Sequence, residues 1–536
     1  MNVMIKLEKM KNTFKNIGVF LSMLLLLAAC TVEEHPKFIG ADVLFDNTDN
    51  SQTALYGIYN GYAGYHYYGS TFMHVTNYAS GMINGPRPQD LDGSIALNPQ
   101  ATNNDINKTW VDMYKMIGRA NDFITNMQAV EMEDVVEQND QLGQALFLRA
   151  FTYFNLVRIW GEVPLVLETA TSTNMNFSKS TKEKIVEQIV LDLEEAASLM
   201  KGDETANVQM SGRPVKFAAN MVLAHVYMYM AGNQTAGETE YWQKAHDEAM
   251  KVYGRYSLVN DFRDLWHPQT CNYTSEAVFE LQGNIENTFR LIQTHIPNKT
   301  IAANTWGRFR ANLEVYTAHA EAYNGLDPRY EATYITEWTD RNGKSKKGYS
   351  TSKTNINRTS NLLAFPWTYK YWAKDDETTA STYNTDRNMV VYRYGHLLLM
   401  LAEIENELNG PANAYSYINE LLGRARNSTD TPGAEPADWA GMTQEQFRAA
   451  IMLEYQFELF TEGHDFFYNR RRGIEFFGTN VIEKHNNFPH YDFSKKYDKL
   501  FPAVGTPEAN RVILLPIPSD ELIGNPNVNE QNPGYL

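Results

Sequence analysis

The tripeptide Gly343-Lys344-Ser345 is the stretch of this chain that most resembles a catalytic motif, because phosphate-binding loops end in this way. Such a loop also needs a glycine five positions before Gly343, where this chain has Trp338. The sequence contains no G-x-S-x-G or H-E-x-x-H motif, and its two cysteines cannot build a thiolate metal site. We therefore predict that the protein is not an enzyme and needs no cofactor.

Acidic side chains gather at three places where they could do chemistry. Residues 90–93 (DLDG) and 46–50 carry the oxygen ligands that calcium prefers, but neither follows the twelve-residue calcium loop pattern. A structural calcium site at either stretch is therefore an alternative, and two solvated turns are the favoured interpretation. Glu462 and Asp465 lie close to the basic run 470–472, and we interpret these charges as structural ion pairs rather than an acid–base pair.

Aromatic residues are the remaining candidates, with 32 Tyr, 26 Phe and 9 Trp in the chain. Exposed Tyr and Trp rings suit sugars, since the ring face packs against pyranose C–H groups while neighbouring polar side chains bond the hydroxyls. Tyr65, Tyr67 and Tyr68 share one predicted loop, and Trp306 and Arg308 share another. The alternative, which applies to any single ring, is that it packs inside the protein.

The N-terminus has the layout of a secretory signal peptide. Residues 1–16 carry four lysines and one glutamate, residues 17–29 are apolar, and two alanines precede Cys30. The sequence LAAC at 27–30 resembles a bacterial lipobox, so we expect cleavage to leave Cys30 as a lipidated first residue that anchors the protein in a membrane. The alternative is a plain signal peptide whose cleavage site falls near a cysteine.

Net charge and hydropathy limit the classes of binding partner and of membrane attachment that this chain could have. The formal net charge of −17 and the lack of clustered Lys and Arg argue against nucleic acid. No later segment approaches 18 uninterrupted apolar residues, so we expect no transmembrane helix in the mature chain. Cys271 is the only cysteine besides Cys30, so no internal disulfide is expected.

Helical periodicity dominates the elements that must position these residues. Residues 139–160 are apolar around most of the helix circumference, which predicts a helix buried on several sides that ends at Gly161. Two further segments, within 223–253 and 401–425, each place small residues on facing helices. This pairing resembles tetratricopeptide-type helix hairpins.

The middle of the chain differs, because Gly, Pro, Asn and Thr are frequent there. Residues 276–282 predict a strand, and residues 364–372 place four aromatic rings on one side at period two. We predict a mostly α fold with a loop-rich region of short strands. The predicted limits are a signal peptide at 1–29 and one unit at 30–536, with a helical scaffold at about 40–260 and 389–536 and a loop-rich insertion at about 261–388.

Four segments in order resemble one family, the SusD/RagB outer-membrane lipoproteins of Bacteroidota. The segments are FLRAFTYFNLVRIWGEVPLVLE (147–168), VVYRYGHLLLMLAEIENELNG (390–410), LEYQFELFTEGHDFFYNRRRG (453–473) and LLPIPSDELIGNPNVNEQNPGY (514–535). The resemblance implies a SusD-like helical bundle with tetratricopeptide-like pairs, anchored in the outer membrane and facing the cell exterior. It also implies capture of oligosaccharides, without catalysis, for a SusC-like TonB-dependent transporter.

The same resemblance implies where ligand binds. Residues 302–329 match the family's Trp-containing segment before D-P-R, which makes Trp306 the predicted platform and Arg308 its polar neighbour. The family's other ligand loop falls at about 64–93 and has no Trp here, which favours a smaller or more polar ligand, such as an acidic sugar, over a starch-like one. The further predicted contact residues are Tyr68, Asn84 and Arg87.

Three alternatives stay open from the sequence. An oligopeptide binder would use the same scaffold with backbone-directed polar grooves. A surface hydrolase would need two carboxylates about 5–10 Å apart in a cleft. A helical-repeat adaptor with no small ligand would explain the scaffold but not the aromatic loops.

Overall fold

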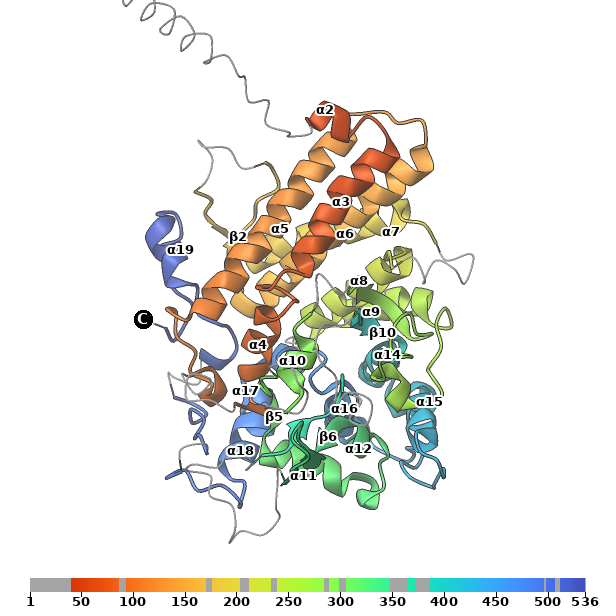
Figure 1. The fold of residues 1–536 in the computed structure, drawn as a ribbon, viewed down its shortest axis with the longest axis vertical. Helices are drawn as coiled ribbons and strands as arrows, with labels where there is room; N and C mark the ends of the chain where they lie inside the picture. The colour runs from red at the N-terminus through yellow and green to blue at the C-terminus, as the bar shows by residue number, and fades with distance from the viewer. Residues whose placement is uncertain are drawn as a thin grey trace, which may run out of the picture.

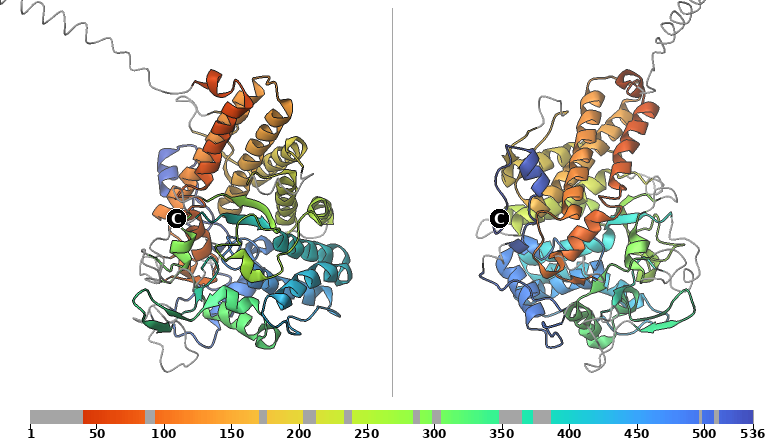
Figure 2. Two further views of the ribbon diagram at one scale, coloured as in Figure 1. Left: turned by 45° about the vertical axis from the view of Figure 1, so that its right-hand side comes forward. Right: turned by 60° about the vertical axis from the view of Figure 1, so that its left-hand side comes forward.

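The protein is mostly helical. The computed structural model describes residues 40–85, 93–169, 176–202, 212–232, 239–283, 289–297, 305–347, 365–372, 386–495, 498–506 and 511–535. Figure 1 and Figure 2 show the long N-terminal helices side by side at one end of the molecule, and the later helices, short strands and loops at the other. The predicted fold class, mostly α with short strands, is confirmed.

The N-terminal helices form an elongated bundle. Its long helices are α3 (Thr48–Tyr62), α5 (Asn104–Gln128), α6 (Val135–Trp160) and α7 (Lys182–Leu199), and its short elements are α2 (Ala41–Leu44), α4 (Thr71–Tyr78) and the 3₁₀ turn η2 (Ser94–Ala96). Helix α6 is almost wholly buried, as predicted, because α3, α5 and α7 pack around it. It ends at Gly161, whose φ of 73° favours glycine. The side chain of Asn47 caps α3, so residues 46–50 serve as a helix start.

The predicted helix pairs are present. They are α8 (Lys216–Ala231) with α9 (Thr239–Val252) and α14 (Tyr394–Asn409) with α15 (Pro411–Asn427), followed by α16 (Gln444–Leu459). The small residues Ala224, Ala245 and Ala402 are completely buried, which lets the helices approach closely. Helix α14 also packs on α9, so the two pairs lie against each other although they are far apart in the sequence.

Short strands connect the bundle to the loop-rich region. One four-stranded sheet has the order β1 (Ile83–Asn84), β5 (Arg310–Ala311), β9 (Trp367–Thr368) and β6 (Tyr334–Ile335). The two-stranded sheets pair β4 (Ala277–Leu281) with β10 (Met389–Arg393), β2 (Val163–Pro164) with β3 (Lys179–Ser180), and β7 (Glu337–Thr339) with β8 (Ser345–Lys347). All pairings are antiparallel. The strand predicted at 276–282 is confirmed as β4.

The alternation predicted for residues 364–372, with four aromatic rings on one side at period two, is wrong in the part that the structure describes. Only Trp367 and Thr368 form strand β9. Tyr371 has a φ of 68°, which turns the backbone and ends the alternation of sides. Trp367 therefore joins a small apolar cluster with Trp338, while Tyr371 joins the main core.

The C-terminal part of the chain closes the fold. Its short elements are η6 (Arg470–Arg472), α17 (Gly473–Phe477), the π-helical turn η7 (Gly478–Glu483), α18 (Lys484–Asn486) and α19 (Ser519–Gly524). The last segment lies against the end of α6, where Asn532 donates to the carbonyl oxygen of Trp160 at 2.9 Å and Leu515 donates to that of Ile159 at 2.8 Å. Within the described ranges, no helix is both long and apolar enough to cross a membrane.

Ion pairs are buried where the scaffold meets the loop-rich region. Glu458 contacts Arg393 at 2.7 Å, Arg329 at 2.9 Å and Arg424, and Glu462 contacts Arg393 at 2.8 Å. Burial by itself would raise the pKa of Glu458, but the three guanidinium groups hold it well below its usual range. The prediction that Glu462 serves in structural ion pairs is therefore confirmed.

Asp465 and the arginines Arg471 and Arg472 of the basic run are held by different kinds of contact. The Asp465 carboxylate accepts the backbone N–H of Thr461 at 2.6 Å, and burial raises its pKa to about 7. Arg471 and Arg472 both form ion pairs with Glu403. The ion-pair interpretation thus holds for these two arginines, whereas Asp465 serves through a backbone hydrogen bond.

Candidate functional site

Trp306 and Arg308 lie on the segment that leads into β5. The short helix α10 (Leu291–His295) fixes this segment, because Trp306 N–H donates to the carbonyl of Gln293 at 2.6 Å and Arg308 N–H donates to that of Thr294 at 2.5 Å. The Trp367 indole N–H donates to the carbonyl of Gly307 at 3.3 Å from the other side. The backbone beneath the predicted platform is therefore held on two sides.

The Trp306 ring is half-buried. The guanidinium carbon of Arg308 lies 5.2 Å from the ring centroid, which is within cation–π range. The ring of His74, from helix α4, lies 6.3 Å away. The Tyr78 hydroxyl donates to the carbonyl of Arg308 at 3.3 Å, so α4 supports both residues. We call Trp306, Arg308 and the α4 residues His74 and Tyr78 the Trp306 site.

Asn84 lies behind this site rather than on it. It forms strand β1 opposite Arg310 of β5, two residues after Arg308. Its side chain is only 2% exposed. The structure therefore brings Asn84 near the Trp306 segment, but in a buried position within the sheet.

Tyr68 lies in the core, against the prediction that it contacts ligand at the surface. Its ring stacks near Phe151 at 6.1 Å and is 4% exposed. Asn155 of α6 donates to the hydroxyls of both Tyr67 and Tyr68, at 2.9 and 3.3 Å. Burial raises the pKa of both phenols. Of the three tyrosines in this loop, only Tyr65 is exposed.

Two other predicted residues, Cys30 and Arg87, lie outside the described residues, as does the acidic stretch at 90–92. Lipidation of Cys30 and ligand contact by Arg87 therefore stay predictions. Within the described ranges, no group of three or more His, Cys, Asp and Glu side chains is arranged to hold a metal ion.

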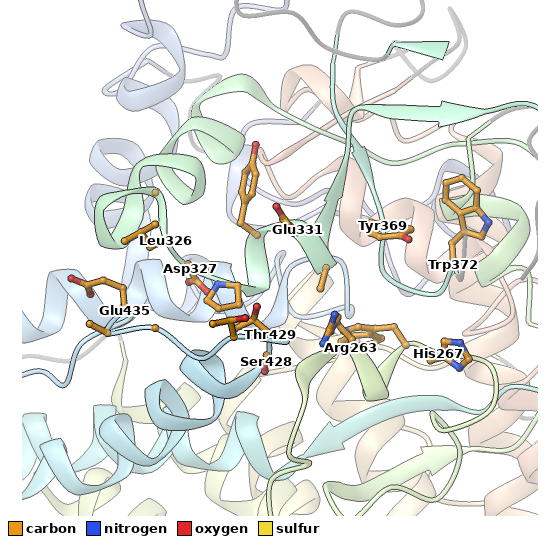
Figure 3. Close-up of a pocket in the computed structure, with 18 residues that line it drawn as sticks. Arg263, His267, Leu326, Asp327, Glu331, Tyr369, Trp372, Ser428, Thr429 and Glu435 are labelled. Atoms are coloured by element: carbon orange, nitrogen blue, oxygen red, sulfur yellow. The ribbon is translucent and has the colours of Figure 1, made fainter. Parts of the chain in front are cut away.

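A pocket of about 690 Å³ lies elsewhere in the loop-rich region, and sequence reasoning missed it (Figure 3). Its walls are the 3₁₀ turn η4 (Phe262–Leu265), helix α12 (Arg329–Thr333) with the residues before it, and the loop that follows α15. Tyr369 and Trp372 lie at one end. We call this pocket the Arg263 slot. Its residues come from four distant segments without a shared motif; the features predicted from the sequence reach it only at Tyr369, one of four rings at period two, and at the D-P-R end of the Trp306 segment.

The inner wall of the Arg263 slot is anchored in the buried ion pairs. Asp327 lines the slot and pairs with Arg329 at 2.7 Å. Burial opposes ionisation of Asp327, but Arg329 and a hydrogen bond from His319 hold its pKa well below the usual range. Arg329 in turn contacts Glu458. The slot is therefore built on a base of buried ion pairs.

Family models cover most of the chain in two pieces. The model described as the SusD family matches residues 223–535, more than half of the chain. The chain belongs to the SusD family. A second model, described as starch-binding associating with outer membrane, matches residues 49–228. The resemblance predicted from the four motifs is therefore confirmed.

Individual relatives agree with this assignment. SusD-like protein P2 of Formosa agariphila is 27% identical over 537 residues, covering 96% of this chain and 99% of the relative. A SusD homolog from Bacteroides thetaiotaomicron superposes with a TM-score of 0.75 at 21% identity, over 92% of this chain and 98% of that one. A structure with bound xylogluco-oligosaccharide has a TM-score of 0.70 at 17% identity, over 89% and 98%. The SusD-like fold is thus confirmed.

Family membership also bears on activity and location. SusD family proteins bind ligands and do not catalyse reactions, so the prediction that this protein is not an enzyme is confirmed. The description of the N-terminal model associates its members with the outer membrane.

Proposed function

We propose that this protein captures oligosaccharides outside the cell and delivers them to a SusC-like TonB-dependent transporter of the outer membrane. The observation that carries the proposal is the half-buried Trp306 ring, part of which reaches solvent, held over a fixed backbone with Arg308 beside it. A supported ring can bind a pyranose face at little entropic cost, and Arg308 supplies donors for hydroxyl or carboxylate oxygens. A relative of the same fold that holds a xylogluco-oligosaccharide supports this ligand class.

Trp306→Ala tests the ligand site. We expect the variant to lose at least tenfold in affinity for any oligosaccharide that binds the wild type at roughly μM–mM concentration, with Ile523→Ala, an 84% exposed residue of α19, as the matched surface control. Titration calorimetry against a polysaccharide and oligosaccharide panel measures this. Unchanged sugar affinity in Trp306→Ala would sink the assignment of the site, and tight binding of peptides alone would favour an oligopeptide carrier.

The anchor and the transporter need separate experiments. We expect wild-type protein in the outer-membrane fraction and Cys30→Ala in the soluble fraction, because the acyl chains on Cys30 would supply the anchor. Membrane retention of Cys30→Ala would contradict lipidation. Affinity purification of the wild-type protein should also recover a transporter barrel, and recovery of none would contradict delivery to such a partner.

A further inference from the structure

The Arg263 slot has the dimensions of a ligand site separate from the Trp306 site. Its volume of about 690 Å³ falls within the range of small-molecule pockets, about 300–1,000 Å³. Figure 3 shows it as an elongated space with Trp372 and Tyr369 toward one end and Leu326 and Glu435 toward the other. None of its lining residues belongs to the Trp306 site.

Arg263 offers a fixed hydrogen-bond donor to the slot. Its Nε and Nη2 groups donate to Asp261 at 2.6–3.1 Å, and Nη2 also donates to Asp430 at 3.1 Å. These two carboxylates, with Asp261 the stronger, raise the pKa of Arg263, so that it stays charged. Among the described residues Nη1 has no acceptor, which leaves two N–H groups for a ligand.

The charge of the slot selects against anions. Asp261 and Asp430 already neutralise the Arg263 guanidinium, and Glu331 and Glu435 add two further carboxylates to the lining. Glu331 is exposed and has no hydrogen-bond or ionic partner within the described part of the chain. An acidic ligand would therefore meet a surplus of negative charge, whereas a neutral hydroxylated ligand finds both a donor and carboxylate acceptors.

Aromatic rings close one end of the slot. The Tyr369 ring is half-buried and lies 5.7 Å from the ring of Trp372, nearly perpendicular to it. The backbone N–H of Tyr369 donates to the carbonyl of Thr333 at 2.7 Å, which fixes the backbone that carries the ring. Such a supported ring, with a fixed donor and carboxylates alongside, is the combination that binds a pyranose.

We propose that the Arg263 slot is a second carbohydrate-binding site, which holds a neutral pyranose unit between Tyr369 and the Arg263 Nη1 group and rejects uronic acids. It stands on its own residues and adds to the binding proposed at Trp306. Two sites on one chain would retain a long glycan more firmly than either site alone, because the second contact is intramolecular.

The test uses the full mature ectodomain and four defined probes: cellotetraose, maltotetraose, mannotetraose and tetragalacturonate. Affinities are measured by titration calorimetry for the wild type, Trp306→Ala, Tyr369→Ala and the double variants Trp306→Ala/Tyr369→Ala and Trp306→Ala/Arg263→Gln. We expect Trp306→Ala to keep measurable affinity for at least one neutral tetrasaccharide. Adding Tyr369→Ala should then weaken this residual binding at least tenfold, and Arg263→Gln should weaken it about fivefold to tenfold.

Glu331→Gln adds a specificity readout: removing one carboxylate charge should raise tetragalacturonate affinity and leave the neutral probes within about twofold.

Each outcome decides the proposal. If no neutral tetrasaccharide binds Trp306→Ala, or if Tyr369→Ala and Arg263→Gln both leave its residual binding unchanged, the slot is not a carbohydrate site. Stronger binding of tetragalacturonate than of every neutral probe in Trp306→Ala would also overturn it. If Trp306→Ala binds like the wild type while Tyr369→Ala loses binding, the slot stands and the Trp306 site fails.

Discussion

The loop at 63–70 and the segment at 305–311 both place aromatic rings beside polar residues between helices, yet their environments are opposite. Helix α6 packs over the first, and its Asn155 donates to the hydroxyls of Tyr67 and Tyr68. The second ends in β5, where the backbone is held on both sides and the Trp306 ring stays half-buried. The two loops are thus similar in composition, but the rings of Tyr67 and Tyr68 pack in the core whereas the Trp306 ring stays partly accessible to solvent.

This difference shows what decides whether a ring can bind ligand. A tyrosine can enter the core when a buried partner meets its hydroxyl, since the cost of losing water is then offset. Asn155 provides that partner in the first loop. In the second segment, hydrogen bonds to α10 hold the backbone, so the ring does not need burial to be fixed. Stability should therefore depend on the first loop and binding on the second.

The largest effect expected from this comparison comes from Tyr67→Ala. Tyr67 is completely buried, so removing its ring should lower the free energy of unfolding by about 3–5 kcal/mol. Tyr67→Phe keeps the ring, removes the hydroxyl that accepts from Asn155, and should cost about 1 kcal/mol. Urea unfolding followed by circular dichroism measures both. A loss below about 1 kcal/mol in Tyr67→Ala would break the distinction between the two loops.

A second prediction concerns the charge of Glu280 in strand β4, where the helical scaffold meets the loop-rich region. Burial raises the pKa of Glu280 in β4 to about 7, and Asn388 donates to its carboxyl group at 2.7 Å. Because the folded pKa is above the unfolded value, the stability that this group contributes is full below about pH 4.5 and is lost as the pH rises through 7. Glu280→Gln keeps a neutral acceptor and should stabilise the protein by roughly 2–3 kcal/mol at pH 8.

Thermal or urea unfolding of Glu280→Gln and wild type at pH 5 and pH 8 checks this sign. We expect the variant to exceed the wild type by less than about 1 kcal/mol at pH 5 and by a clear margin at pH 8. A variant that is equally destabilised at both pH values would mean that Glu280 acts through packing rather than through its charge.

Trp306→Ala should change the free energy of unfolding less than Tyr67→Ala does, and less than Glu280→Gln does at pH 8. The ring is half-buried and contacts Arg308 and His74, so we expect a loss of about 1 kcal/mol. The comparison predicts that this variant loses sugar affinity while Tyr67→Phe keeps it. If Trp306→Ala were destabilised as strongly as Tyr67→Ala, Trp306 would belong to the core.

The smallest effect should come from Tyr65→Ala, within the same loop as Tyr67. Tyr65 is 46% exposed and its ring contacts only the adjacent His66 ring among the described aromatic contacts. Its free energy of unfolding should stay within about 0.5 kcal/mol of the wild type, as is usual for surface positions. A loss close to that of Tyr67→Ala would show that the whole loop, and not its buried rings, stabilises the fold.

Much of the scaffold could be predicted because its pattern is local. The apolar run at 139–160 became α6, and the residues at 276–282 became β4. The period-two placement of rings predicted at 364–372 failed because the sequence pattern does not reveal the turn at Tyr371. The Trp306 segment was found through its family motif, whereas the Arg263 slot joins residues from four separate segments and leaves no such signal.

The sequence by itself determined the helical scaffold, the family and the two loops worth testing, since periodicity and motif spacing are properties of neighbouring residues. The tertiary structure alone decided which rings face solvent. Asn155 lies 88 positions from Tyr67 in the chain, and Arg263 is 167 positions from Asp430, yet these contacts set which side chain is buried and which donor is free. Burial depends on such long-range packing, which composition does not encode locally.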